Sequence, residues 1–300
     1  MKGRIFVVIL LVAGAAVAGR WANRSATPKA AAGQDETRQT FRLEPGARVE
    51  VSRINGSVEV TTSETDTAEV RVIRTADSAE DLEYGKVVVE GSESYLSVNG
   101  SQGGARGFWR WLQGGGRVRQ QVTLLLPRRV EFAASRVNGQ VRAGEVEGSV
   151  EVSHVNGRVE VAQAAGRFEV SHVNGGVKLA VSRPGEQGLD VEHVNGNVEV
   201  RLKELVNADI DVERQNGGLS LNVPNVTLQE RYNRSNARVR LGSGGSPFQI
   251  SHVNGNVRFE SDASGATTAT NAVVVAAPAA DGELPPPPPL TALPPAPPAP

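Results

Sequence analysis

The middle of the chain alternates between apolar and polar residues, with Val at most of the apolar positions. Such alternation places successive side chains on opposite faces of a β-strand. Strands are predicted at 70–73, 86–90, 95–98, 118–126, 148–152 and 166–170. The predicted inward residues of the regular part include Val150, Val152, Val159, Val161, Phe168, Val170, Val177 and Leu179. The residues between them, Glu151, Glu160, Glu169 and Lys178, are expected to face solvent.

A second pattern is a corner segment of the type Val-Ser-His-Val-Asn-Gly, which recurs eight times with variations. Its Asn residues are Asn55, Asn138, Asn156, Asn174, Asn195, Asn216, Asn236 and Asn254. From Asn138 onward they are separated by 18, 18, 21, 21, 20 and 18 residues. A gap of 83 residues separates Asn55 from Asn138, which leaves room for about four further periods or for an insertion. Regular spacing of this kind indicates a repeat architecture.

Each period contains two short strands and two turns, which predicts an all-β fold. We expect a single-stranded β-solenoid (β-helix) with coils of about 18–21 residues. At about 3.3 Å per residue, 18 residues trace roughly 60 Å, which suits one coil. The Gly after each Asn is expected to turn the chain through a positive φ. The Asn side chains, about 4.8 Å apart in stacked coils, are expected to form a structural hydrogen-bonded ladder.

The outer parts of the chain differ from this middle. Residues 1–18 combine a basic start with an apolar run, which predicts a signal peptide or an N-terminal anchor. Residues 19–40 are expected to be a linker, and 41–261 the folded domain with a Gly-rich, aromatic insertion at 101–116. Residues 262–300 are rich in Ala and then Pro, so we expect a disordered tail. The prediction is an exported protein in the periplasm, at the cell surface or secreted.

Composition removes several function classes. The net charge is −1, so no overall field favours nucleic acid. There is no Cys, which removes disulfides, thiolate metal sites and Cys nucleophiles. The acidic residues form a repeating decoration without a distinctive pair, and Asp190, Asp209 and Asp211 have no evident partner base. We therefore expect no enzyme activity and no cofactor.

The pattern resembles the adhesin-like β-solenoid domains of bacterial cell envelopes, a family of unknown function. The resemblance covers about residues 41 to 260. It rests on the opening at 43–51, the first corner at 54–60, the strand Val122-Thr-Leu-Leu-Leu-Pro127 and the serial Asn-Gly corners. It implies a non-catalytic, exported β-solenoid, and it supplies neither a ligand nor catalytic residues.

All four His residues of the chain, His154, His172, His193 and His252, lie two places before a corner Asn. In the other segments this place holds Arg53, Arg136, Arg214 and Arg234. His154, His172 and His193 belong to successive periods and are weak candidates for a shared Zn²⁺ ion. No Asp or Cys accompanies them, however, and Arg alternates with His, so the sequence favours a solvated column without a metal. Contact with an anionic polymer is the other functional interpretation.

The insertion contains Phe108, Trp109, Arg110 and Trp111, which are candidates for binding a partner. The alternative is that they cap an open end of the solenoid. The leading hypothesis for the whole chain is an adhesin-like protein that presents an extended surface to a cell-surface glycan, a wall polymer or an envelope protein. End-to-end self-association into a scaffold and a periplasmic sensory or regulatory module are the alternatives.

Overall fold

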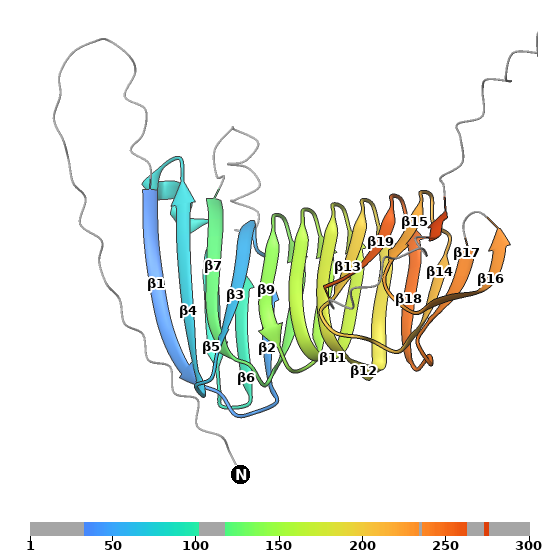
Figure 1. Ribbon diagram of the computed structural model, residues 1–300. Helices are drawn as coiled ribbons and strands as arrows, with labels where there is room; N and C mark the ends of the chain where they lie inside the picture. The colour runs from blue at the N-terminus through green and yellow to red at the C-terminus, as the bar shows by residue number, and fades with distance from the viewer. Residues whose placement is uncertain (1–32, 102–117, 234–235, 263–272, 276–300) are drawn as a thin grey trace, which may run out of the picture.

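The computed structural model describes residues 33–101, 118–233, 236–262 and 273–275. They form an all-β fold in which twenty strands join into one sheet (Figure 1). The only helical element within these ranges is the short 3-10 helix Ala79–Glu83. Among the described residues, no helix has the length and apolar character that crossing a membrane requires.

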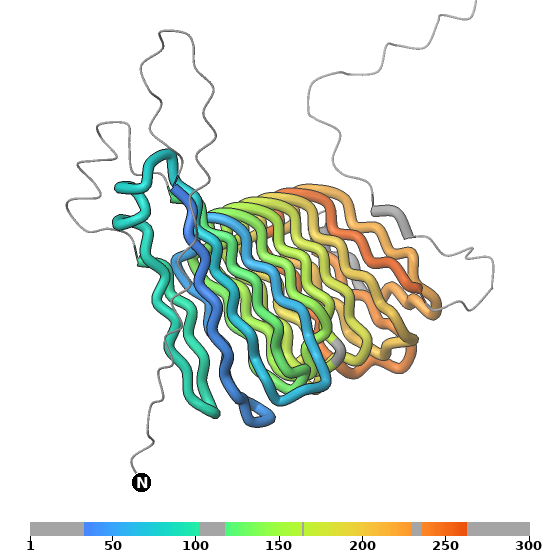
Figure 2. The backbone as a smooth tube through the Cα atoms, turned by 90° about the vertical axis from the view of Figure 1, so that its left-hand side faces the viewer, coloured from blue at the N-terminus to red at the C-terminus, as the bar shows by residue number. Residues whose placement is uncertain are grey.

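The central strands lie in two rows of parallel strands, and the chain passes from one row to the other at each corner. These strands are β8 (Val130–Val137), β9 (Val141–Val146), β10 (Val150–Val155), β11 (Val159–Val173), β12 (Val177–Val194) and β13 (Val198–Leu202). In the row that precedes the corners, Val152 lies beside Val170, and Val170 beside Val191. As far as β12 and β13, these segments therefore pair in parallel with those 18 or 21 residues further on, as the spacing predicts. Figure 2 shows the resulting stack, viewed from the side of β1 (Gly33–Arg42).

The order of strands in space differs from their order in the chain. The strands involved are β2 (Ala47–Ser52), β3 (Gly56–Ser63), β6 (Tyr95–Gly100), β7 (Val118–Pro127), β14 (Ala208–Glu213), β15 (Leu219–Asn222), β18 (Ser246–Val253) and β19 (Val257–Ser261). At one end, β2 and β3 lie between β6 and β7 on one side and β8 and β9 on the other. At the other end, β18 and β19 lie between β12 and β13 on one side and β14 and β15 on the other. The 83-residue gap is therefore not four regular periods, because the two segments that flank it are neighbours in space.

Antiparallel strands cover both ends of this parallel stack. They are β1 (Gly33–Arg42), β4 (Thr67–Ala76), β5 (Val87–Gly91), β16 (Val226–Asn233), β17 (Asn236–Leu241) and β20 (Val273–Val275). At the N-terminal end, β4 pairs with β7, β1 with β4, and β5 with β6. At the C-terminal end, β17 pairs with β14, β16 with β17, and β20 with β15.

Two predicted boundaries are wrong at these ends. The predicted linker 19–40 contains the start of β1 at Gly33, and the predicted tail 262–300 contains β20. The start of β1 was not predicted because β1 is an edge strand. Its first seven residues, Gly-Gln-Asp-Glu-Thr-Arg-Gln, show no alternation of apolar and polar side chains. The proposed insertion at 101–116 lies almost wholly outside the described residues.

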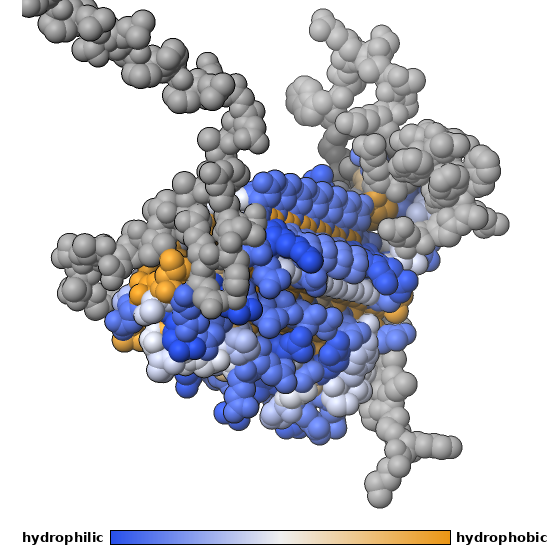
Figure 3. Space-filling model, turned by 90° about the vertical axis from the view of Figure 1, so that its right-hand side faces the viewer, coloured by the Kyte–Doolittle hydropathy of each residue, from blue (hydrophilic) through white to orange (hydrophobic). Residues whose placement is uncertain are grey.

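The space between the two rows is filled by Val, Leu, Ile and Phe. All eight inward residues predicted above are buried, with at most 4% of their surface exposed, which confirms the predicted alternation. Large and small side chains alternate along the stack at one inward position, which is occupied by Phe132, Val150, Phe168, Leu189 and Phe248. Figure 3 shows the outer surface, where rows of hydrophilic residues run along the stack. The interior thus holds the layers together and leaves the outer columns free to carry function.

Candidate functional site

The corner asparagines form a continuous ladder of side-chain hydrogen bonds. Each Nδ2 donates to the Oδ1 of the preceding asparagine over 3.0–3.2 Å, in the spatial order Asn55, Asn138, Asn156, Asn174, Asn195, Asn254 and Asn216. At the N-terminal end, Asn55 Nδ2 donates to the Val118 carbonyl oxygen at 2.8 Å. The buried Gln120 accepts from the Asn55 backbone N–H at 3.0 Å. The ladder is thereby closed at this end without a further asparagine.

Asn236 does not belong to this ladder, so its predicted place there is wrong. Its strand, β17, runs antiparallel to β14, and its Oδ1 accepts a hydrogen bond from the backbone N–H of Arg214. Asn236 is followed by Ala237 where the other corners have Gly. A further Val-Asn-Gly at residues 98–100 is also out of register, because Asn99 lies beside Ser52. The motif alone therefore does not determine membership of the ladder.

The glycine after each Asn is required by close packing. A Cβ atom on Gly157 would lie 2.1 Å from the carbonyl oxygen of Gly139, and one on Gly175 would lie 2.2 Å from that of Gly157. No real Cβ tolerates such a contact, so the stacked corners admit only glycine. The expectation that this glycine has a positive φ holds for Gly56, Gly139 and Gly157, with φ of 151–157°, but not for the later corners. The left-handed conformation that recurs in every layer lies instead at the residue two places before the Asn. The residues with φ of 51–56° there are Arg53, Arg136, His154, His172, His193, Arg214 and His252.

These seven residues form one basic column along the corner edge, which we call the corner column. Its spatial order is Arg53, Arg136, His154, His172, His193, His252 and Arg214. The four imidazole rings are stacked, with centroids 4.8, 4.8 and 4.5 Å apart and interplanar angles of 10° or less. Sequence spacing predicts only the first three as neighbours. His252 joins them because β18 is inserted beside β12. Arg234, predicted in the same column, lies outside the described residues.

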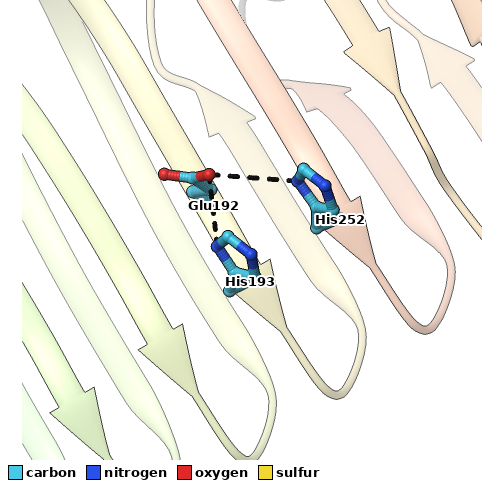
Figure 4. A group of neighbouring side chains, drawn as sticks. All are labelled: Glu192, His193 and His252. Atoms are coloured by element: carbon cyan, nitrogen blue, oxygen red, sulfur yellow. Dashed lines mark ion pairs between the residues drawn. The ribbon is translucent and has the colours of Figure 1, made fainter.

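Two carboxylates, Glu192 and Glu213, lie in the row of small hydroxyl residues beside the corner column, and Glu192 is the one that stands among the histidines. The residues aligned in that row are Ser135, Ser153, Ser171, Glu192, Ser251 and Glu213. The Oε1 atom of Glu192 lies 3.2 Å from His193 Nδ1 and 3.9 Å from His252 Nδ1 (Figure 4). On the opposite side of the His252 ring, Nε2 lies 2.7 Å from Nη1 of Arg214. Since guanidinium only donates hydrogen bonds, this contact makes Nε2 the acceptor and assigns the ring proton to Nδ1.

The outward charges of the other row of strands neutralise one another. Their column alternates in sign through Glu59, Arg142, Glu160, Lys178, Glu199 and Arg258. Arg142 contacts Glu160 at 2.8 Å, and Lys178 contacts Glu199 at 3.0 Å. The hydrogen bond from Arg142 lowers the pKa of the Glu160 carboxyl group. This face therefore carries no net excess of either charge, in contrast to the corner column.

The three aspartates without an evident partner in the sequence have distinct environments. Asp209 contacts Arg240 at 2.8 Å, and Asp211 contacts Arg238 at 3.0 Å, so both hold the antiparallel strand β17 against β14. The hydrogen bond from Arg240 lowers the pKa of Asp209. Partial burial raises the pKa of Asp190, and the neighbouring Glu192 carboxylate adds to this effect. Asp209 and Asp211 are thus paired within the C-terminal cap, whereas Asp190 lies on the surface near Glu192.

A hollow of about 580 Å³ lies at the N-terminal end of the corner column. It is lined by Arg53, Arg136, Asn99, Glu90 and Val88, among others. Arg53 Nε donates to Asn99 Oδ1 at 2.9 Å and so lies fixed at its wall. The predicted partner-binding residues Phe108, Trp109, Arg110 and Trp111 lie outside the described residues.

Replacing His172 tests the left-handed conformation of the corner column. We expect His172→Val to destabilise the fold by about 1–2 kcal/mol, because a β-branched residue adopts positive φ poorly. His172→Asn should stay within about 0.5 kcal/mol of this chain, since Asn enters the left-handed region readily. Urea unfolding of the three proteins measures both values. Equal stabilities for the Val and Asn variants would contradict the assignment.

Comparison with known proteins gives only distant likenesses. A "putative cell adhesion protein" from Clostridium sporogenes aligns at 12% identity over 76% of this chain and 100% of that one, with a TM-score of 0.36. A "putative adhesin" from Bacteroides fragilis aligns at 11% identity over 75% and 97%, with a TM-score of 0.26. No family model and no curated protein sequence matches the chain. These descriptions agree with the adhesin-like resemblance of the sequence, but likeness at this level carries no argument about function.

Proposed function

We propose that this chain is a non-catalytic, adhesin-like protein of the bacterial cell envelope, which uses a β-solenoid to bind a linear anionic glycan along the corner column. The parallel pairing of segments 18 or 21 residues apart supports the solenoid. The predicted signal sequence at 1–18 supports export. The proposal assigns no reaction to the carboxyl groups, since those of the described cap and of the second row are engaged in ion pairs.

The observation that carries this proposal is the unbroken basic character of the corner column. Seven Arg and His residues follow one another at the strand spacing, with no acidic residue in the column itself. Six intervals of about 4.8 Å give a stripe of roughly 29 Å. Arginine carries a permanent charge and donates hydrogen bonds in a fixed fork that fits carboxylate and phosphate groups. The stripe thus offers permanent charges at Arg53, Arg136 and Arg214 and the hydrogen-bonding groups of four imidazoles between them, which matches a linear polymer that carries anionic groups and hydroxyl groups.

The row of serines beside the column strengthens this assignment. Ser135, Ser153 and Ser171 stand next to Arg136, His154 and His172, and their hydroxyl groups can both donate and accept. Sugar hydroxyl groups need partners of this kind in addition to a charge. The described part of the column contains no aromatic side chain besides imidazole on which nucleobases would stack. An anionic glycan therefore fits this edge better than a nucleic acid does.

Self-association into a scaffold is less well supported. End-to-end stacking would pair the outer edges of strands such as β1 with another copy. The β1 sequence carries Asp35, Glu36 and Arg38, and charged edge strands oppose such pairing. The antiparallel caps also interrupt the parallel register that a continuous stack would need.

Binding to polygalacturonate, a linear chain of sugar carboxylates, tests the proposal. The triple variant Arg53→Asn, Arg136→Asn and Arg214→Asn removes the permanent charges and retains residues that tolerate positive φ. We expect it to bind roughly thirtyfold more weakly, the equivalent of about 2 kcal/mol for three exposed charge pairs. Calorimetry at low salt measures this, and binding should weaken as salt is added.

The control removes three cations from the other row of strands. Arg142→Gln, Lys178→Gln and Arg258→Gln together change the net charge by the same amount, yet should leave affinity within about twofold, because these residues lie outside the corner column. Neutral pullulan should bind neither protein. Equal losses in the two triple variants, or no binding of polygalacturonate by the unaltered chain, would refute the proposed site.

A further inference from the structure

The stacked imidazoles and Glu192 form a group that the sequence did not predict. Two observations in the sequence opposed a metal site: no Asp or Cys accompanied the histidines, and Arg alternated with His. The structure changes both. Glu192, at the end of β12, contacts His193 and His252, and the four histidines are contiguous, with arginine only at the two ends of their stack.

We propose that Glu192, His193 and His252 bind a divalent transition-metal ion of the Zn²⁺ type. One ligand atom from each residue lies within 4.8 Å of the others. Glu192 Oε1 lies 3.2 Å from Nδ1 of His193 and 3.9 Å from Nδ1 of His252 (Figure 4). Tetrahedral zinc with ligands at about 2.0–2.1 Å holds its ligand atoms roughly 3.3–3.4 Å apart. To bind the ion, the stacked rings of His193 and His252 must turn out of their parallel arrangement, so that their Nδ1 lone pairs converge with Glu192 Oε1 on one point.

The types of donor select the class of metal. Two neutral imidazoles and one carboxylate suit Zn²⁺, Cu²⁺, Ni²⁺ and Co²⁺, whereas Mg²⁺ and Ca²⁺ prefer sites made wholly of oxygen. Three protein ligands leave a fourth position for water or for an outside ligand. The site is also accessible, since the His193 side chain is 44% exposed and that of His252 is 33% exposed. The proposed site is thus an open surface site.

Arg214 opposes the ion in a way that can be measured. Coordination through Nδ1 of His252 places the ring proton on Nε2, which now lies 2.7 Å from a guanidinium nitrogen. Two donors would then face each other, so Arg214 must turn away when the metal binds. Arg214→Asn removes this obstacle as well as a positive charge. We expect the variant to bind Zn²⁺ more tightly than the unaltered chain, by about threefold or more.

Calorimetric titration of the full chain with ZnCl₂ at pH 7.5 tests the site. We expect one tightly bound Zn²⁺ per chain, which a large excess of Mg²⁺ does not displace. Glu192→Gln and His252→Asn should each weaken binding by at least about tenfold, the loss that even an outer partner of a ligand typically produces. Titration with Co²⁺ provides a second readout, because a site with few ligands gives intense visible absorption that both variants should lose.

Two matched variants serve as controls. Glu213→Gln changes the other glutamate of the same surface row, which stands beside Arg214 instead of a histidine. His154→Asn removes the ring at the far end of the stack, next to Ser153. Both should bind Zn²⁺ within about twofold of the unaltered chain. No Zn²⁺ binding, or equal losses in Glu192→Gln and Glu213→Gln, would overturn the proposal. The polymer proposal is tested independently, since its triple variant changes Arg53, Arg136 and Arg214 and none of the three proposed metal ligands.

Discussion

Gly175→Ala is expected to destabilise the protein by about 3 kcal/mol or more, although it adds a single methyl group. The added Cβ would lie 2.2 Å from the carbonyl oxygen of Gly157 in the layer beneath. The two corners must then separate, which stretches the ladder hydrogen bond from Asn174 to Asn156 and the backbone bond from Asn174 to Val155. Overpacking against a backbone that cannot turn aside lies at the upper end of single-substitution effects. Urea or thermal unfolding measures the loss.

The neighbouring residue provides the control. A Cβ on Gly176 meets only the Asn197 carbonyl oxygen, at 3.7 Å, which is an ordinary contact. Gly176→Ala should therefore leave stability unchanged or raise it by up to about 1 kcal/mol, because alanine reduces the entropy of the unfolded chain. If both substitutions cost the same, the requirement for glycine would come from corner flexibility and the close-packing explanation would be wrong.

The second large effect is expected from shortening the chain. A protein that ends at residue 243 lacks β18 and β19, which lie between β12 and β13 on one side and β14 and β15 on the other. We expect residues 204–243 to lose their ordered structure, because β14 and β15 are then left without their parallel neighbours. Limited proteolysis with mass spectrometry should cut this segment and spare the layers that precede it.

A chain that ends at Val275 is the matching control. It retains every strand that the structure describes, so its proteolytic pattern and unfolding midpoint should equal those of the full chain. Protection of residues 204–243 in the shorter protein would show that β14 and β15 can stack directly on β12 and β13. The inserted pair would then not be essential to the C-terminal layers.

Local features of this fold could be predicted from the sequence with good accuracy. Apolar alternation identified the inward faces, since Val150, Phe168 and Leu179 are all buried. The recurring Asn predicted the ladder, and seven of the eight residues join it. These features succeed because they depend on one period and its nearest copy, which the spacing of 18–21 residues places in register.

The order of the layers could not be predicted in the same way. Nothing in the segment around Asn254 distinguishes a neighbour of Asn195 from a neighbour of Asn236, because the corners are nearly identical in sequence. The exception at Asn236 did carry a signal, since Ala237 cannot approach the next corner as glycine does. The group of Glu192, His193 and His252 forms only because β18 lies beside β12, so it could not be predicted without the layer order.

The conformation of the corner column was also missed, for a different reason. Glycine is the usual residue with positive φ, whereas histidine and arginine occupy that region here at seven positions. The conformation recurs at the same place in each layer, and propensities of single residues do not include a constraint that arises in the stack.

The insertion of β18 and β19 also determines when this protein can finish folding. A stack in chain order could grow layer by layer as the polypeptide leaves the ribosome or a membrane channel. Here the layers up to β13 can form in that way, but the parallel pairing that joins β14 and β15 to the stack requires β18 and β19, which are synthesised after them. Completion of the C-terminal half is therefore coupled to the arrival of almost the whole described chain. In the export that residues 1–18 predict, such a delay would keep the C-terminal layers extended during passage, and these layers would close only at the destination.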